Sequence, residues 1–294
     1  MLNTQTAQLS SQVLLALKQS RPRFWLYTAG PFLLGSIVGF VLHANQSDFN
    51  YFYFGSMFLY FLLIANYLMY GVNDYFDYET DILNPKKDSK EVRVSSDSRR
   101  TLKNWLLVTS ILSVVAVLFQ PTILTASLLV VFLFGAIGYS MPPLRFKNSI
   151  LLDSISNGFY VIPGFLGYGV FAQSLPPYSI ILACWAWAIA MHLYSAIPDI
   201  VYDKKAGMKT TAVWLGKSKS LLTCSILWVI FAGTLLLTIG LKFTTILAFV
   251  YPLIPLLHLK INPLKIEKVY WWFPYITTVI GATATIEFLF YTIS

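Results

Sequence analysis

Two groups of acidic residues in this sequence repeat at the spacing of helix turns. Within each group the aspartates follow one another at intervals of three or four residues, which places them on one face of a helix, and Asn73 is paired with Asp77 four residues later. The first group is Asn73, Asp74, Asp77 and Asp81, and the second is Asp199 and Asp203. Like charges at this spacing repel, and a helix end that carries them needs a compensating cation.

The residue types indicate which cation would compensate. Both groups offer only oxygen ligands, and neither contains histidine or cysteine. Oxygen ligands suit Mg²⁺, which binds a few carboxylates and completes its shell with water and substrate phosphate. A single acidic loop is more often a solvated surface, but two such groups in one chain favour a shared magnesium site.

Basic residues gather close to the acids. Arg145 and Lys147 lie between the two groups, and Lys204, Lys205 and Lys209 follow the second group directly. Such cations can neutralise the phosphate oxygens that a metal leaves free. The charges therefore predict a diphosphate site.

The elements that position these residues are predicted to be membrane helices. Of the 294 residues, 56% are hydrophobic and only 12% are charged, with a mean hydropathy of +0.64. A soluble domain carries about 25% charged residues. Nine stretches are long enough to span a bilayer, and backbone groups in hydrocarbon require them to be helical. They are 24–43, 51–72, 103–119, 121–139, 152–172, 178–197, 220–240, 243–259 and 270–292.

The chain is therefore expected to be an all-α membrane protein with one domain over residues 1–294. The first 20 residues contain a short apolar turn that would form a helix on the membrane surface. With the N-terminus in the cytoplasm, all but one of the 21 Lys and Arg residues fall on the inner side, and only Lys242 lies outside. By the positive-inside rule, both acidic groups then face the cytoplasm from the cell membrane.

The same pattern weighs against other classes of protein. The net charge of +8 is explained by topology rather than by nucleic acid, since the bases lie between apolar spans. A transporter would place ionisable residues near the middle of the bilayer, whereas the predicted spans carry few, with Glu287 as the clear exception. A lyase or phosphatase acting on a diphosphate without an acceptor would use the same site and remains an alternative.

The two acidic groups resemble the signature motifs of the UbiA superfamily of intramembrane prenyltransferases. The resemblance extends over nearly the whole chain and implies nine helices. It implies that the acidic groups hold Mg²⁺ and diphosphate through Asn73, Asp74, Asp77, Asp81, Asp199 and Asp203, with Asp74, Asp77, Asp199 and Asp203 as catalytic residues. It also implies diphosphate contacts from Asn73, Tyr139, Arg145, Lys147, Lys204 and Lys209. Lys204 and Lys205 stand where many members have another acid, so the number of metal ions is left open.

Three further segments are similar to the lycopene elongases of C50 carotenoid synthesis, some of which are also hydratases. They are 20–27, 153–158 and 195–199. This similarity implies transfer of a dimethylallyl group from its diphosphate to a lipophilic acceptor such as lycopene. Family members with an aromatic or quinone precursor, a chlorophyllide or a glycerol ether lipid as acceptor remain alternatives.

The expected mechanism begins with ionisation of the donor. Mg²⁺ and basic residues stabilise the departing diphosphate, and aromatic faces stabilise the allylic cation. A double bond of the acceptor then attacks, and a base removes a proton unless water adds. His192 lies seven residues before Asp199 and is interpreted as a hydrogen-bonded packing residue, which leaves an aspartate or the diphosphate to accept the proton.

Overall fold

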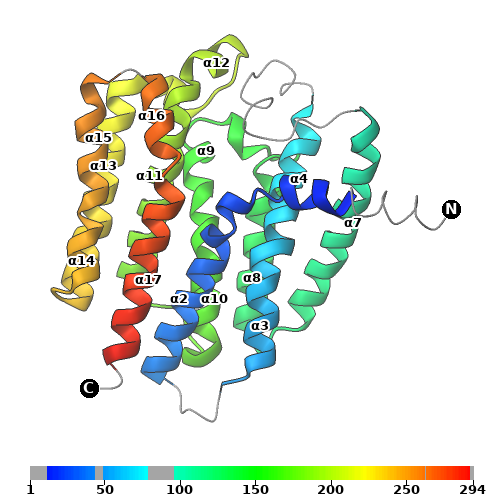
Figure 1. Ribbon diagram of the computed structural model, residues 1–294, viewed down its shortest axis with the longest axis vertical. Coiled ribbons are helices and arrows are strands. Elements are labelled where there is room, and N and C mark those ends of the chain that lie inside the picture. Colours follow the sequence, from blue (N-terminus) through cyan, green and yellow to red (C-terminus); the bar gives the residue numbers. More distant parts are fainter. Residues whose placement is uncertain (1–11, 44–48, 79–95, 262, 292–294) are drawn as a thin grey trace.

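The protein is a bundle of helices. The computed structural model describes residues 12–43, 49–78, 96–261 and 263–291, and within these ranges it contains helices and turns but no strand. The main helices run side by side along the long axis of the molecule (Figure 1). The predicted all-α class is therefore confirmed for the described part of the chain.

The elements alternate between long helices and short 3-10 or π-helical turns. In chain order they are η1 (Pro22–Phe24), α2 (Leu26–His43), α3 (Tyr51–Leu59), the π-helical η3 (Tyr60–Ala65), α4 (Asn66–Phe76), α7 (Ser96–Leu118), α8 (Ile123–Gly138), η4 (Phe146–Asn148), α9 (Leu152–Ile155), η5 (Ser156–Val161), α10 (Ile162–Ala172), α11 (Tyr178–Ala196), η6 (Ile197–Asp199), α12 (Ile200–Lys205), α13 (Thr211–Ile239), α14 (Phe243–Ala248), α15 (Val250–Leu257), η7 (His258–Lys260), α16 (Pro263–Tyr270) and α17 (Phe273–Tyr291).

Seven helical segments of the described ranges are long and apolar enough to cross a membrane. They are Pro22–His43, Tyr51–Phe76, Arg99–Leu118, Tyr178–Lys205, Thr211–Ile239, Phe243–Lys260 and Lys265–Phe290. Each overlaps one of the nine stretches predicted from the sequence. The other two stretches differ, because α8 is apolar but has only 16 residues and the stretch 152–172 is divided among α9, η5 and α10.

Local hydrogen bonds explain why the stretch 152–172 is not one regular helix. The Ser156 hydroxyl donates to the carbonyl of Leu152 at 2.6 Å, and the Asn157 amide donates to the carbonyl of Asp153 at 2.7 Å. Side chains that bond backbone carbonyls one turn earlier compete with regular helix geometry. Pro163 then stands in the first turn of α10, where its missing N–H costs nothing.

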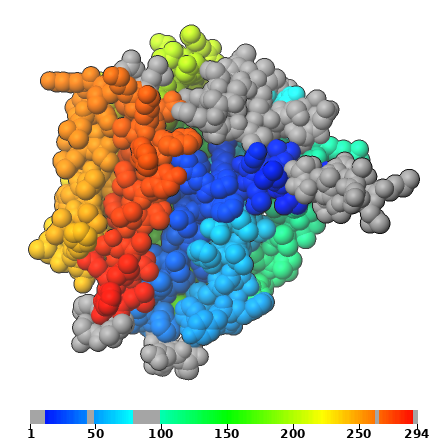
Figure 2. Space-filling view, viewed as in Figure 1, coloured from blue at the N-terminus to red at the C-terminus, as the bar shows by residue number. Residues whose placement is uncertain are grey.

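Helices α2 and α10 approach closely along small residues. A Cβ atom at Gly35 would lie 1.9 Å from the carbonyl oxygen of Gly164, and one at Gly167 would lie 2.5 Å from that of Phe32. Such contact between backbones is typical of packing between membrane helices, where small residues permit dense van der Waals contact. Helix α2 also packs against α17, and the two helices lie side by side on the face that Figure 2 shows.

Two hydrophobic cores divide the bundle. The first is built from α2, α3, η3, α8 and α10 around Phe61, Phe132 and Leu166, and the second from α11, α13, α15, α16 and α17 around Trp228 and Tyr251. Helix α11 contributes to both cores, through Ala188 to the first and Ala190 to the second. The boundary between the two halves therefore runs along α11.

The segment before η1 forms a helix over residues 12–19, which lies across α4 at an angle (Figure 1). Ala16 packs with Tyr67 and Leu102, whereas Leu14 is 55% exposed. One side thus contacts the bundle and the other presents apolar surface. A role as a surface helix stays a prediction, and residues 1–11 lie outside the described residues.

Glu287, the one clear acidic residue that the sequence placed within a predicted span, contacts the start of α14. Its carboxylate accepts hydrogen bonds from the backbone N–H groups of Phe243 at 2.8 Å and Thr244 at 3.0 Å. These donors begin α14 and have no partner within that helix, so Glu287 caps its N-terminus.

Candidate active site

A cavity of about 750 Å³ lies between the two halves of the bundle. Its wall is formed by η1, α2, α4, η5, α11, η6, α16 and α17, together with Tyr139 at the end of α8. Of the residues predicted to bind metal or diphosphate, Asn73, Asp74, Tyr139 and Asp199 line it. The fold thus brings one end of the first acidic group and one residue of the second to a common space.

The first acidic group ends a continuous helix. The elements α3, η3 and α4 form one helical segment, and Asp77 is its C-terminal cap residue. Asp74 is only 3% exposed, and its Oδ1 lies 3.0 Å from the guanidinium of Arg21. The same guanidinium stands 4.6 Å from the centre of the Tyr70 ring. Arg21 therefore neutralises a carboxylate that would otherwise be costly to bury.

Two predicted diphosphate ligands meet the same helix end from the loop after α8. The ammonium of Lys147 contacts the carboxylate of Asp77 and lies 3.4 Å from the amide oxygen of Asn73. The guanidinium of Arg145 lies 3.8 Å from the Asp77 carboxylate, and the Ser140 hydroxyl donates to Asn73 at 2.8 Å. Both cations thus stand beside acidic-group residues at this helix end.

The second acidic group lies on an interrupted helix. Pro198 sits in the turn η6 between α11 and the short α12, and Asp199 closes that turn with its side chain half-buried. Asp203 is half-buried on α12, while the side chains of Lys204 and Lys209 are exposed. None of these last three residues lines the cavity. The backbone N–H of Lys209 donates to the Asn148 side chain at 2.9 Å, which ties this loop to the one after α8.

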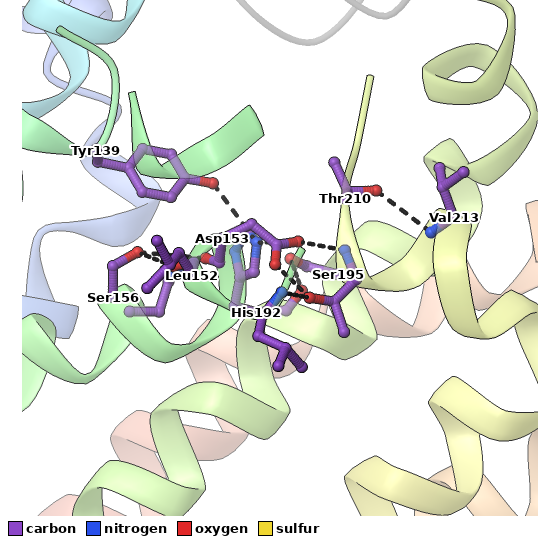
Figure 3. A network of polar contacts seen from close by, with 11 residues as sticks. Tyr139, Leu152, Asp153, Ser156, His192, Ser195, Thr210 and Val213 are labelled. Carbon is purple, nitrogen blue, oxygen red and sulfur yellow. Dashed lines mark hydrogen bonds and ion pairs between the residues drawn. The ribbon is translucent and has the colours of Figure 1, made fainter. Parts of the chain in front are cut away.

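A second polar network, formed by Tyr139, His192 and Asp153, borders the cavity (Figure 3). The Tyr139 hydroxyl lies 3.5 Å from Nε2 of His192, and the same nitrogen lies 4.0 Å from Oδ2 of Asp153. Asp153 is 1% exposed and accepts a hydrogen bond from the backbone N–H of Thr211 at 2.9 Å. The sequence interpretation of His192 as a packing residue did not anticipate its place on the cavity wall.

Aromatic side chains form another part of the wall, which also includes the charged residues Lys18, Arg23 and Glu267. Phe24, Tyr27, Tyr160, Trp187 and Tyr270 line the space that extends from the acidic end. Tyr27 meets Trp187 edge to face, with 6.5 Å between the ring centres. The cavity therefore joins a charged end to an aromatic interior, which is suited to a molecule with a charged head and an apolar tail.

The oxygen ligands at the charged end fit Mg²⁺ in kind. Asn73, Asp74 and Asp199 line the cavity and carry amide or carboxylate oxygens. Asp77 lies close to Asn73, since the ammonium of Lys147 contacts both side chains. Within the described ranges, no three His, Cys, Asp or Glu side chains form a ready metal cluster. Because Mg²⁺ keeps water and substrate phosphate in its shell, it does not need a complete set of protein ligands. Asp81 lies outside the described residues.

Comparison with known proteins identifies the family. The model of the UbiA prenyltransferase family matches residues 28–289. The chain belongs to this family.

Its relatives include proteins from Haloferax volcanii and Haloarcula japonica. The lycopene elongase/hydratase of Haloferax volcanii is 38% identical, with 91% of this chain and 86% of that protein covered. The lycopene elongase/hydratase of Haloarcula japonica is also 38% identical, with 92% and 89% covered. This UbiA family member is thus a prenyltransferase, and its many apolar helices make it an integral membrane protein.

The fold is that of solved UbiA structures. A UbiA homolog from Archaeoglobus fulgidus bound to GPP and Mg²⁺ has a TM-score of 0.71 and 20% identity, with 92% of this chain and 99% of that chain covered. A structure of a UbiA homolog from the same organism bound to DMAPP and Mg²⁺ has a TM-score of 0.70 and 18% identity, with 92% and 98% covered.

Several polar residues that contact the acidic groups were missed in the sequence because these contacts depend on partners far away in the chain. Arg21 and Ser140 contact acidic-group residues 53 and 67 positions away. One signal was available for Asp153, because an acid at the start of an apolar stretch is unusual and marks function in membrane proteins.

Proposed function

We propose that this enzyme transfers a dimethylallyl group from its diphosphate to the end of a long acyclic carotenoid such as lycopene. The observation that carries the proposal is the cavity with a charged end and an aromatic interior. The names of its relatives, which cover most of the chain, support a carotenoid acceptor.

The acidic groups would hold a magnesium diphosphate. We assign Asn73, Asp74, Asp77, Asp199 and Asp203 to this role, with Asp81 as a further ligand outside the described residues. Mg²⁺ supplies Lewis acid stabilisation of the charge that develops on the departing diphosphate. The ligand-bound structures of UbiA homologs from A. fulgidus support this metal and this kind of donor.

Basic side chains would bind the diphosphate oxygens that face away from the metal. Lys147 is 7% exposed and Arg145 is half-buried, so their contacts to phosphate are shielded from water and correspondingly strong. Arg21 stands at Asp74 and is available for the same task, and Tyr139 offers a hydroxyl donor. Lys204 and Lys209 stay predictions, since their exposed side chains lie outside the cavity lining.

The aromatic wall would stabilise the allylic cation. When the bond between the prenyl carbon and the diphosphate oxygen breaks, the electron pair leaves with the diphosphate and the prenyl group becomes positive. Aromatic faces such as those of Trp187 and Tyr270 attract such a cation, and the apolar surroundings exclude water that would quench it. The terminal double bond of the carotenoid then attacks.

We also propose nine membrane passes with the N-terminus in the cytoplasm, so that the site opens to the cytoplasm. Seven segments meet the length and hydropathy needed to span, and α8 with the segment 152–172 would supply the other two passes. The test is labelling of single cysteines by a reagent that does not cross membranes. Lys217→Cys should react only from inside and Leu241→Cys only from outside. The reverse pattern would refute the orientation.

The acceptor is tested with purified enzyme in detergent. Lycopene, dimethylallyl diphosphate and Mg²⁺ should give products heavier by one or two C5 units, with or without added water. Parallel reactions offer an aromatic acid, a quinone precursor or a glycerol phosphate ether instead. Prenylation of one of those alone would refute the carotenoid assignment, and release of diphosphate with no prenylated acceptor would point to a lyase or phosphatase.

A further inference from the structure

His192 occupies a position on the cavity wall that neither acidic group explains. Its side chain is 18% exposed, and it lines the cavity together with Tyr139 and Asp199. Its Nε2 is 4.0 Å from the carboxylate of Asp153 and 3.5 Å from the Tyr139 hydroxyl. Figure 3 shows the imidazole, the carboxylate and the phenol converging on one point. The titratable imidazole of His192 thus lies at the cavity, and the carboxylate of Asp153 lies next to it outside the cavity lining.

The carboxylate of Asp153 is held in place by the start of α13. The backbone N–H of Thr211 donates to Oδ2 at 2.9 Å, and the Thr211 hydroxyl donates to Oδ1. A buried carboxylate is costly unless donors or a cation compensate it. Two donors from one residue satisfy part of this need, and the side of Asp153 that faces His192 can stabilise a positive imidazole.

We propose that His192 is the base that takes the proton released by prenyl transfer, and that Asp153 is a positioning residue that orients and stabilises the imidazolium. The proposal rests on the function proposed above. The π electrons of the acceptor double bond form the new C–C bond, which leaves a cation on the neighbouring acceptor carbon. If an adjacent C–H bond then breaks, its electrons form a new double bond. If water adds instead, its oxygen forms a C–O bond and loses a proton. Either route releases one proton, which His192 accepts.

The depth of His192 in the bundle suits this task. It lies on α11 seven residues before Asp199, which corresponds to about 10 Å along the helix axis. A donor whose diphosphate is bound near Asp199 would extend its prenyl group toward the interior, and the acceptor end must lie beyond it. A base that takes a proton from the acceptor must therefore lie deeper in the bundle than Asp199, as His192 does.

A second histidine provides a matched control. Nδ1 of His258 lies 2.8 Å from the Tyr194 hydroxyl, so this histidine also forms a tyrosine contact on the helix bundle. His258 is 7% exposed and does not line the cavity. Packing and hydrogen bonding are thus common to both histidines, and access to the substrate space distinguishes His192.

The experiment measures steady-state turnover of lycopene and dimethylallyl diphosphate by purified His192→Ala, His192→Gln and His258→Gln enzymes. Loss of a general base should lower kcat by about 10²–10⁴-fold in both His192 variants, with the KM for the donor unchanged. His258→Gln should keep the wild-type kcat. A kcat for His192→Ala equal to that of His258→Gln would overturn the proposal.

Chemical rescue separates a base from a packing residue. Added imidazole should restore turnover of His192→Ala in proportion to its concentration, which also shows that the variant is folded. Pyrazole has nearly the same shape but is a much weaker base, and it should not restore turnover. Equal rescue by the two compounds would show that His192 only fills space and would overturn the proposal.

Asp153→Asn tests the positioning role. It should lower kcat by roughly 10-fold or more while leaving the donor KM unchanged, since the amide cannot stabilise a positive ring. Thr211→Val removes the hydroxyl that contacts Asp153 but keeps the carboxylate, and its kcat should fall less. An equal fall in both variants would assign Asp153 a structural role. If the wild-type enzyme prenylates another acceptor and not lycopene, the proposed function fails, and the same variants on that acceptor still test the base.

Discussion

The two acidic groups have the same sequence pattern but different surroundings. Asp74 lies in the last turn of a continuous helix, is 3% exposed and pairs with Arg21 at 3.0 Å. Asp199 and Asp203 lie on either side of the junction between η6 and α12, after Pro198, and both are half-buried. The first group is thus held in place by cations before any ligand binds, and the second is closer to solvent on a short helix.

This difference should allow the effect of each acid on folding to be separated from its effect on substrate binding and catalysis. A carboxylate that is buried against a cation contributes to folding, because removing it leaves the cation uncompensated. A carboxylate near solvent can be removed with little effect on folding, so that its loss reveals only its role in binding the substrate. The following predictions, from the largest effect to the smallest, test whether the two groups differ in this way.

Removal of one acid from either group should nearly abolish turnover. We expect Asp74→Ala and Asp199→Ala each to lower kcat by at least about 10²–10³-fold, as happens when a preorganised charge-stabilising group is lost. Asp74→Ala should also lower the free energy of unfolding by about 3 kcal/mol, and by more than Asp199→Ala does, because Asp74 is the more deeply buried acid and its loss removes the carboxylate beside Arg21. Thermal unfolding in detergent measures this, and equal destabilisation by both substitutions would contradict the comparison.

Removal of the metal should abolish activity but not the fold. EDTA should stop turnover, and excess Mg²⁺ should restore it, since the developing charge on the diphosphate needs the metal. The melting temperature should change little, because Asp74 and Asp77 have Arg21 and Lys147 as partners without metal. Full activity in EDTA would refute the magnesium assignment, and unfolding in EDTA would refute the view that protein cations hold the first group.

Lys147, which contacts Asp77 of the first group, should affect the binding of the donor but not that of the acceptor. Loss of a charge-assisted contact to phosphate costs about 1.5–3 kcal/mol. Lys147→Ala should therefore raise the apparent donor constant by about 10–150-fold at an unchanged acceptor constant. Initial rates with each substrate varied in turn provide the test. An effect confined to the acceptor would show that Lys147 does not bind the diphosphate.

The cations that follow the second group should matter least. Lys204→Ala and Lys209→Ala remove exposed side chains, whose interactions with charges are screened by water. We expect each to change the donor affinity by at most about 0.5 kcal/mol in the same assay. A loss as large as that of Lys147→Ala would mean that the second group is as closely surrounded by cations as the first when substrate is bound.

Local patterns in the sequence were sufficient for the helical class, the family resemblance and the two acidic groups. Hydropathy identifies apolar spans because each span must satisfy its own backbone in lipid, and this condition depends only on neighbouring residues. The spacing of Asp74 and Asp77 identifies a common helix face for the same reason. The nine stretches were found in this way, although the division of 152–172 depends on side chain to backbone hydrogen bonds that hydropathy does not detect.

Tertiary structure alone decided which charges meet. Arg21 lies 53 residues from Asp74, and Tyr139 lies 53 residues from His192, so neither contact has a local signature. Packing of α2 against α10 through Gly35 and Gly164, and the position of α11 between two cores, bring these residues to one cavity. Helix packing depends on the shapes of surfaces far apart in the chain, and that is why the contacts of Arg21 with Asp74 and of Tyr139 with His192 could not be identified from the sequence.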